Sequence, residues 1–221
     1  GDPNWTRSFP PFRIIGNIYW VGSYDLATYL ITTSQGHILI NTGVGDTAKQ
    51  IKASVEQLGF NLADTKILTA THGHFDHIGA AAELCGDELP FYIHEADAPA
   101  LSDPEGWGAG YQVPTVPVKD VRTVTQGEVL TFAGFSIEVV HTPGHTPGSA
   151  CFLTDGWVLL GDLVFAGSIG RSDFPNSSPP DMERSLRRFL ELPDPLDVLP
   201  GHGPRTTVGR ERARNRFLAE L

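Results

Sequence analysis

The chain has 221 residues, of which 40% are hydrophobic and 19% charged, and its formal net charge is −10 at pH 7. This length is sufficient for a large hydrophobic core, and the composition is that of a globular protein rather than a disordered or fibrous one. The acidic balance argues against a nucleic-acid backbone as partner, and no apolar run has the length of a membrane span. We therefore expect a partner that is neither a nucleic acid nor a membrane, and the oligomeric state stays open.

The first third of the chain alternates short β-type runs with turns. Asp46 is expected to cap a helix that runs to about Leu58, because Ile51, Val55 and Leu58 share one helical face and Gly59 follows. The apolar, β-branched runs before this helix predict strands over residues 14–21, 27–33 and 37–41.

The middle of the chain continues this alternation up to a long irregular segment. Residues 66–71 form another β-type run, residues 77–85 an alanine-rich helix, and residues 91–94 a further strand. Residues 102–119 are rich in glycine, proline and aromatic residues and have no clear periodicity. A loop of this length in a compact domain is often a lid, so we expect it near a functional site.

The last part of the chain supplies a second group of strands and two helices. Apolar runs predict strands over residues 129–140 and 150–160, and helical patterns cover residues 181–192 and 208–221. Two groups of strands with helices between and after them imply an α/β, four-layer αββα sandwich. Two mixed β-sheets would pack face to face, with helices on both outer faces, in one domain over residues 1–221. In the first of these helices, four residues are expected to face inward: Met182, Leu186, Phe189 and Leu190.

The strand over residues 66–71 leads into an unusual group of side chains. His72, His74, Asp76 and His77 lie within six residues. Side chains alternate along a strand, so His72 and His74 project to the same side, while Asp76 and His77 lie around the following turn. Imidazole and carboxylate suit divalent zinc, iron or manganese. One short segment can therefore contribute ligands to two metal ions.

Three further ligand-type residues each follow an apolar run at a glycine-containing turn: His145, Asp162 and His202. A count of ligands assigns His145 to the metal of His72 and His74, and His202 to the metal of Asp76 and His77. Asp162 is left to bridge the two ions. Each set leaves a coordination position open, which is typical of a catalytic rather than a structural site.

These seven residues, in this order and in these turns, resemble the ligand set of the metallo-β-lactamase superfamily. The resemblance implies the same αββα fold, with the metals at one edge between the sheets. The chain divides at about residue 70, because its two parts resemble different groups of the superfamily, and the split suggests a hybrid chain. A natural homologue collinear with both parts would remove that hypothesis. The N-terminal segment (residues 1–70) resembles third-subclass metallo-β-lactamases over residues 11–22, 25–31 and 36–43. The C-terminal segment (residues 71–221) resembles short glyoxalase II-type hydrolases over residues 71–79, 141–148, 161–162, 167–175 and 199–209.

We expect a hydrolase that holds two Zn²⁺ per chain, or iron or manganese, and acts on a small-molecule substrate. A metal-bridging hydroxide would attack an acyl carbonyl, and the ion held by His72, His74 and His145 would stabilise the oxyanion. The second ion would steady the departing nitrogen or sulfur, and Asp76 would orient the hydroxide. Asp76 therefore joins the three histidines in the expected catalytic set.

Three alternatives for the reaction stay open. Hydrolysis of β-lactams is favoured, because the lactamase-like segment would bring residues 22–26 to the metal rim. A glyoxalase II-like thioesterase acting on hydroxyacyl-thiol conjugates is the second, since Asp162 resembles the bridging carboxylate of that group. A mononuclear iron protein like the persulfide dioxygenases is the third. The compartment follows the reaction: periplasmic or secreted for a lactamase, cytoplasmic for a glyoxalase.

Other residues are candidates for supporting or substrate-binding roles. Asn41, at the end of a strand, is a candidate to support the metal loop. Arg171 falls where long glyoxalase II enzymes carry a basic glutathione-binding residue. Three aromatic residues are candidates to line a cleft: Tyr24, Trp107 and Tyr111. His37 and His94 have no ligand context and are expected at the surface.

Overall fold

The computed structural model describes residues 2–108 and 110–221. Its larger sheet has seven strands in chain order, antiparallel from the first to the fourth and parallel from the fourth to the seventh. The strands are β1 (Phe12–Ile15), β2 (Ile18–Trp20), β3 (Tyr29–Thr33), β4 (Gly36–Ile40), β5 (Thr65–Thr69), β6 (Phe91–His94) and β7 (Val121–Val124). The helices of this half are α1 (Ala48–Gln57), α2 (Phe75–Ile78), α3 (Ala81–Cys85), α4 (Pro99–Ser102) and α5 (Pro104–Trp107).

The second sheet has six strands in the order β15-β14-β11-β10-β9-β8. Of its neighbouring pairs, β11 and β14 are parallel and the others are antiparallel. Its strands are β8 (Val129–Phe132), β9 (Phe135–His141), β10 (Ala150–Leu153), β11 (Trp157–Gly161), β14 (Asp197–Pro200) and β15 (Thr206–Thr207). A separate hairpin consists of β12 (Val164–Phe165) and β13 (Ser168–Ile169). The helices of this half are α6 (Pro179–Phe189), α7 (Val208–Arg214) and α8 (Arg216–Ala219).

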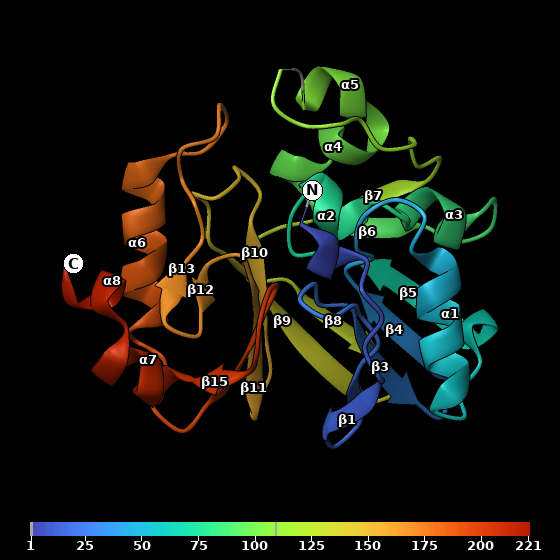
Figure 1. The fold of residues 1–221 in the computed structure, drawn as a ribbon, viewed down its shortest axis with the longest axis horizontal. Coiled ribbons are helices and arrows are strands. Elements are labelled where there is room, and N and C mark those ends of the chain that lie inside the picture. Colours follow the sequence, from blue (N-terminus) through green and yellow to red (C-terminus); the bar gives the residue numbers. More distant parts are fainter. Residues whose placement is uncertain (1, 109) are drawn as a thin grey trace.

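The elements form four layers (Figure 1). Helices α1 and α3 lie outside the first sheet, the two sheets face each other in the middle, and α6, α7 and α8 lie outside the second sheet. This is the α/β sandwich of two mixed sheets that the sequence predicted. None of the described helices has the length and apolar composition needed to cross a membrane.

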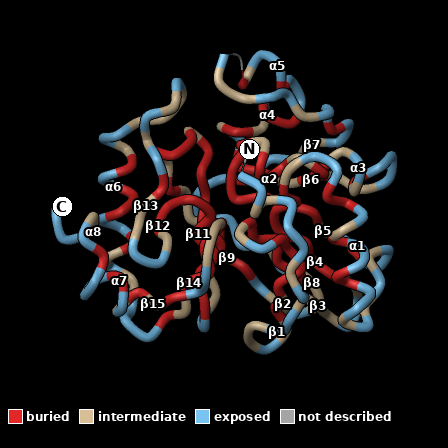
Figure 2. Tube along the Cα trace, in the orientation of Figure 1, coloured by how far each residue is buried: buried red, intermediate tan, exposed pale blue. Residues whose placement is uncertain are grey.

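The core is divided into three apolar layers because strand side chains alternate between the two faces of a sheet. In β3, Tyr29 and Ile31 belong to the cluster between the sheets, whereas Leu30 belongs to the cluster beneath α1. In β11, Leu159 faces the other sheet, whereas Leu160 packs in the cluster that contains residues of α6. The central strands are consequently buried on both faces (Figure 2).

Three predicted strands are hairpins in the structure. Residues 14–21 divide at Gly16, which has a φ of +52°, and residues 129–140 divide at Ala133 and Gly134, with φ of +52° and +80°. Residues 150–160 form β10 and β11. Ala133 carries no sequence signal for a left-handed conformation, so its turn could not be recognised. Strands β7, β12, β13, β14 and β15 were not predicted.

The helix predictions were wrong at several ends. Asp46 does not cap α1: it has a φ of +65°, and Thr47 occupies the capping position without a side-chain cap hydrogen bond. The predicted helices over residues 77–85 and 208–221 each divide into two, the latter at Asn215, whose side chain caps α8. In α6, Met182, Leu186 and Phe189 are buried as predicted, and Leu190 is partly buried just beyond the helix.

The predicted loop over residues 102–119 contains α5, and Ala109 within it lies outside the described residues. His37 and His94 are not at the surface: both are buried, with 6% and 5% of their area exposed. His94 stacks on His141, which lies at the edge of the core, with ring centroids 3.9 Å apart. Burial and the neighbouring His141 lower the pKa of His94 to about 4.

A buried hydrogen bond joins the sheets at the edge where β14 ends. Tyr29 Oη donates to Pro200 O over 2.6 Å. We expect Tyr29→Phe to lower the free energy of unfolding by about 1–2 kcal/mol, because the carbonyl would stay buried without its donor. Urea denaturation measures this change. Tyr19→Phe is the matched control, since Tyr19 is only partly buried; equal effects of the two substitutions would contradict the assignment.

Candidate metal centre

The first ligand-type residues lie where β5 ends. After Thr69 the chain leaves the sheet and turns into the short helix α2. His72 and His74 precede this helix, and Asp76 and His77 lie inside it. All four side chains are buried, His72 and His77 completely.

The other three residues reach the same edge from the second sheet. His145 lies in the connection between β9 and β10, Asp162 directly follows β11, and His202 follows β14. The main chain joins the two halves here, because Ala27 N donates to Gly201 O and Gly203 N donates to Asp25 O. The carboxyl ends of strands from both sheets therefore converge at one place.

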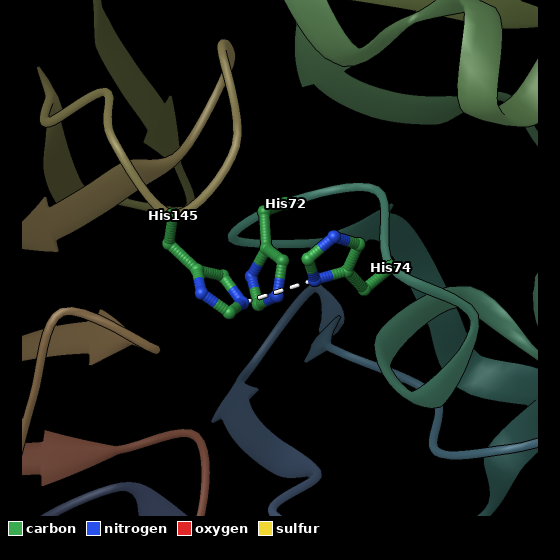
Figure 3. Close-up of side chains that lie close together, drawn as sticks. All are labelled: His72, His74 and His145. Atoms are coloured by element: carbon green, nitrogen blue, oxygen red, sulfur yellow. Dashed lines mark hydrogen bonds between the residues drawn. The ribbon is translucent and has the colours of Figure 1, made fainter. Parts of the chain in front are cut away.

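His72, His74 and His145 form the first of two clusters. One nitrogen of each ring lies within 4.8 Å of the corresponding nitrogens of the other two. Nδ1 of His74 and Nε2 of His145 are 2.9 Å apart, and the three rings point toward one another (Figure 3). This is the three-histidine set that the ligand count predicted.

Asp76, His77, Asp162 and His202 form the second cluster, with one ligand atom of each within 4.8 Å of the others. Nε2 of His77 lies 3.3 Å from Asp76 Oδ2 and 3.3 Å from Asp162 Oδ1. Nε2 of His202 lies 3.1 Å from Asp76 Oδ2.

Asp162 faces both clusters. Its Oδ2 lies 3.3 Å from His145 Nε2 and 3.8 Å from His72 Nε2 on one side, and 3.4 Å from His202 Nε2 on the other. The carboxylate thus lies where a group shared by two neighbouring cations would be required.

The buried polar atoms of this centre fit a pair of divalent cations. Nε2 of His72, Nε2 of His77 and Oδ1 of Asp162 are buried and have no hydrogen-bond partner in the described part of the chain. Buried polar atoms normally have partners, so each unsatisfied atom requires an explanation. Nitrogen and carboxylate donors in groups of three and four suit zinc and also iron or manganese.

The opposite nitrogens of three rings are held by other groups of the chain. His72 Nδ1 lies 3.0 Å from Thr71 Oγ1, and Thr71 N donates to Asn41 Oδ1 over 3.0 Å. His145 Nδ1 lies 2.6 Å from Arg171 O, and His202 Nδ1 lies 3.2 Å from a carboxylate oxygen of Asp25. Such partners orient a ligating imidazole.

The electrostatics of the centre differ between the two clusters. Burial, together with His145, lowers the pKa of His74 to about 3, so its ring is neutral. Burial opposes ionisation of Asp162, but the charges of His77 and His202 outweigh it and hold its pKa well below the usual range. Asp162 is therefore an anion. Metal ligation requires neutral imidazoles and ionised carboxylates. Burial lowers the pKa of His77 and His202, but the neighbouring carboxylates outweigh it and raise the pKa of His77 to about 9 and that of His202 to about 12. These two rings would therefore release protons when a metal binds.

A pocket of about 260 Å³ opens above both clusters. Tyr111 and Arg171, two of the sequence candidates, lie on its wall, but Arg171 is exposed and its guanidinium pairs with Asp173. Trp107 is not among the lining residues and packs against the His74 ring, with centroids 5.8 Å apart. Tyr24 lines a different groove. The aromatic walls of the pocket are Trp5, Phe75, Tyr111, Phe165 and Phe174.

Sequence reasoning missed several residues of this centre. Trp5 packs against His202, with ring centroids 5.6 Å apart, although 196 intervening positions separate them in the chain. Asp25 lies within the loop expected at the metal rim, but its contact with His202 was not foreseen. Phe174 lies 5.0 Å from the His74 ring. These contacts join distant segments, so no local pattern indicates them.

Comparisons with known proteins place this centre in context. A sequence model of the family described as Metallo-beta-lactamase superfamily matches residues 26–202. A probable metallo-hydrolase of Bacillus subtilis, YqgX, is 36% identical over 218 residues, which cover 96% of each chain. The hydroxyacylglutathione hydrolase GloC of Haemophilus influenzae is 35% identical over 182 residues, 79% of this chain and 84% of that protein.

Solved structures extend the likeness to the whole molecule. A β-lactamase from Chitinophaga pinensis has a TM-score of 0.81 at 30% identity and covers 100% of this chain and 93% of its own. The subclass B3 metallo-beta-lactamase BJP-1 of Bradyrhizobium japonicum has a TM-score of 0.74 at 29% identity, over 90% of this chain and 80% of its own. The Bacillus subtilis relative is collinear with both segments, so the hypothesis of a hybrid chain is removed.

The position of Asp162 leads to a prediction about metal content. We expect the zinc-loaded protein to hold two ions, and Asp162→Ala to retain one after dialysis, because the second cluster loses a ligand and the two ions lose the anion between them. Elemental analysis measures the stoichiometry. Asp173→Ala, an exposed carboxylate at the pocket rim, should retain both ions. Two ions in Asp162→Ala would contradict the bridging role.

Proposed function

Because the chain belongs to the metallo-beta-lactamase superfamily and is a metal-dependent hydrolase, we propose that it works with two zinc ions and opens β-lactam rings. The position of Asp162 between two ligand clusters at the floor of one pocket supports the two-metal centre. The main support for β-lactams is the likeness to the β-lactamase from Chitinophaga pinensis over the full length of this chain. A closed structural site would need no pocket above it.

Two bound divalent ions would lower the pKa of a water so that it loses a proton near neutral pH. They would also supply positive charge that stabilises the developing oxyanion. The residues of the chain have distinct parts in this proposal. His72, His74 and His145 would hold one ion, Asp76, His77 and His202 would hold the other, and Asp162 lies between the two sets. Six of these seven side chains are buried and His202 is partly exposed, so they shield most of the pocket floor from bulk water.

Asp76 is the residue proposed to orient the attacking water. It is on the pocket wall, and the charge of His77 and the hydrogen bond from His202 outweigh burial and hold its pKa well below the usual range. An ionised carboxylate accepts hydrogen bonds only. Asp76 can therefore direct the lone pairs of a neighbouring water toward a substrate carbonyl.

The rim of the pocket supports the β-lactam assignment. The N-terminal segment reaches the centre at two points: Trp5 covers His202 and Phe75, and Asp25 contacts His202 Nδ1. The β-lactamase from Chitinophaga pinensis matches this chain over its full length, including that segment. The pocket is of a size for a small molecule rather than a macromolecule.

A thioesterase acting on hydroxyacyl-thiol conjugates is the second candidate, and one observation favours it. Asp162 is a carboxylate between two clusters, the arrangement that the sequence resemblance associates with glyoxalase II-type enzymes. The similar protein of Haemophilus influenzae carries the name hydroxyacylglutathione hydrolase. The two reactions share acyl attack and differ in whether nitrogen or sulfur leaves. A complete second cluster argues against a protein with a single iron.

A substrate comparison tests the proposal. We expect the zinc-loaded protein to turn over a chromogenic cephalosporin faster than S-lactoylglutathione, at equal concentration. His74→Ala should lower kcat/KM by more than about 100-fold, since loss of the partners behind metal ligands alone costs about 10–100-fold. Absorbance at fixed enzyme concentration measures both reactions. Turnover of the thioester alone would assign the second function, and cephalosporin turnover that survives in His74→Ala would exclude this centre.

The role of the N-terminal segment gives a further prediction. Trp5→Ala should raise KM for the cephalosporin by about two- to ten-fold, because an aromatic contact contributes about 0.5–1.5 kcal/mol, and should leave kcat nearly unchanged. Phe12→Ala removes an exposed aromatic ring of the same segment that does not line this pocket, and serves as the control. An unchanged KM in Trp5→Ala would show that this ring does not contact the substrate.

A further inference from the structure

Asp97 is a completely buried carboxylate that the proposed mechanism does not use. It ends the 3-10 helix Glu95–Asp97, which directly follows β6. Its Oδ2 accepts hydrogen bonds from Gly73 N over 2.8 Å and from Thr146 Oγ1 over 2.6 Å, and its Oδ1 accepts one from Gly148 N over 2.7 Å. Three donors thus converge on one side chain.

These donors belong to the two loops that carry the first cluster. Gly73 lies between His72 and His74 in the loop after β5, and Thr146 directly follows His145 in the loop between β9 and β10. The two loops come from different sheets. Asp97 therefore links the backbone beside two of the histidines to the residue beside the third.

The packing around Asp97 is close enough to fix this link. A Cβ atom at Gly148 would lie 2.6 Å from Asp97 N and 2.7 Å from its Cγ, and a Cβ atom at Gly73 would lie 2.5 Å from the Cβ of Ala100. Real Cβ contacts are essentially never this short, so the Gly148 loop depends on glycine to approach Asp97, and the Gly73 loop depends on glycine to approach the adjoining helix α4. The neighbouring residues leave little room to move.

The hydrogen-bond directions also depend on a carboxylate. Thr146 Oγ1 lies 2.8 Å from Ser149 Oγ and can accept from it while donating to Asp97. Burial raises the pKa of Asp97, and the hydrogen bonds from Thr146, Gly73 and Gly148 oppose this effect. All three partners donate, so an asparagine amide at this position would direct its own donor at one of them.

We propose that Asp97 is a positioning residue that holds the His72–His74 loop and the His145 loop at the separation which the three-histidine metal site requires. This inference rests on the proposed function in so far as that function assigns a metal ion to the first cluster. It adds a determinant of metal affinity that touches neither the metal nor the substrate.

The test measures metal affinity rather than turnover. Zinc and cobalt(II) binding are measured by competition with a chromogenic chelator, in a His202→Ala background that leaves only the three-histidine cluster complete. Asp97→Asn should weaken binding by about 10- to 100-fold, the usual effect of removing a partner behind metal ligands, and should change the visible absorption of bound cobalt. Glu95→Gln, which removes an exposed charge from the same helical turn, should bind as the parent does.

A second pair of variants covers the case in which Asp97→Asn does not fold. Thr146→Val removes one donor to Asp97 and should weaken binding, whereas Thr146→Ser retains the hydroxyl and should restore it. Affinities of Asp97→Asn or Thr146→Val within two-fold of the parent would overturn the proposal. A second contrary result would be an equal loss of affinity for both metal ions when Asp97→Asn is made in the otherwise unaltered protein. That result would indicate a general effect on folding. Absence of metal binding by the unaltered protein would instead overturn the proposed function, and with it this inference.

Discussion

The structure depends on burying two carboxylates among five imidazoles at the edge where the sheets meet. A buried, uncompensated carboxylate costs several kcal/mol, so Asp76 and Asp162 require the opposing rings or a cation. The surrounding backbone is shaped to allow this contact. A Cβ atom at Gly201 would lie 2.3 Å from Asp162 Oδ1, and one at Gly170 would overlap the Asp162 carbonyl oxygen. The loops that carry the ligands therefore depend on glycine.

The seven ligand-type residues could be predicted because their signals are local. Four of them, His72, His145, Asp162 and His202, follow the carboxyl ends of strands. The other three lie in the turn and the short helix after β5. The same reasoning identified the two mixed sheets. It failed at the hairpin of Ala133, because no sequence signal marks an alanine with positive φ. It also failed at the start of α1, where Asp46 was expected to cap the helix. Thr47 occupies that position, and its Oγ1 donates to Thr42 O and Val44 O instead of capping the helix.

Residues whose role depends on distant contacts could not be predicted. His94 was expected at the surface because nothing near it in sequence indicates burial, yet its partner His141 lies on the other sheet. Trp5 and Asp97 belong to the same class, since each touches the centre or its loops from a segment that carries no motif. Long-range packing of this kind is decided by the whole core and not by a window of sequence.

The choice of substrate is separable from the metal centre. The chain is similar in structure to a protein named β-lactamase and in sequence to one named hydroxyacylglutathione hydrolase, and a fold by itself does not fix a reaction. In this chain, Trp5, Phe165 and Phe174 form apolar walls of the pocket, while Arg171 is paired with Asp173. A rim without an unpaired cation among the described lining residues favours contacts to the apolar part of a substrate over recognition of its carboxylate. Specificity in this molecule therefore depends on segments that can change without disturbing the buried charges.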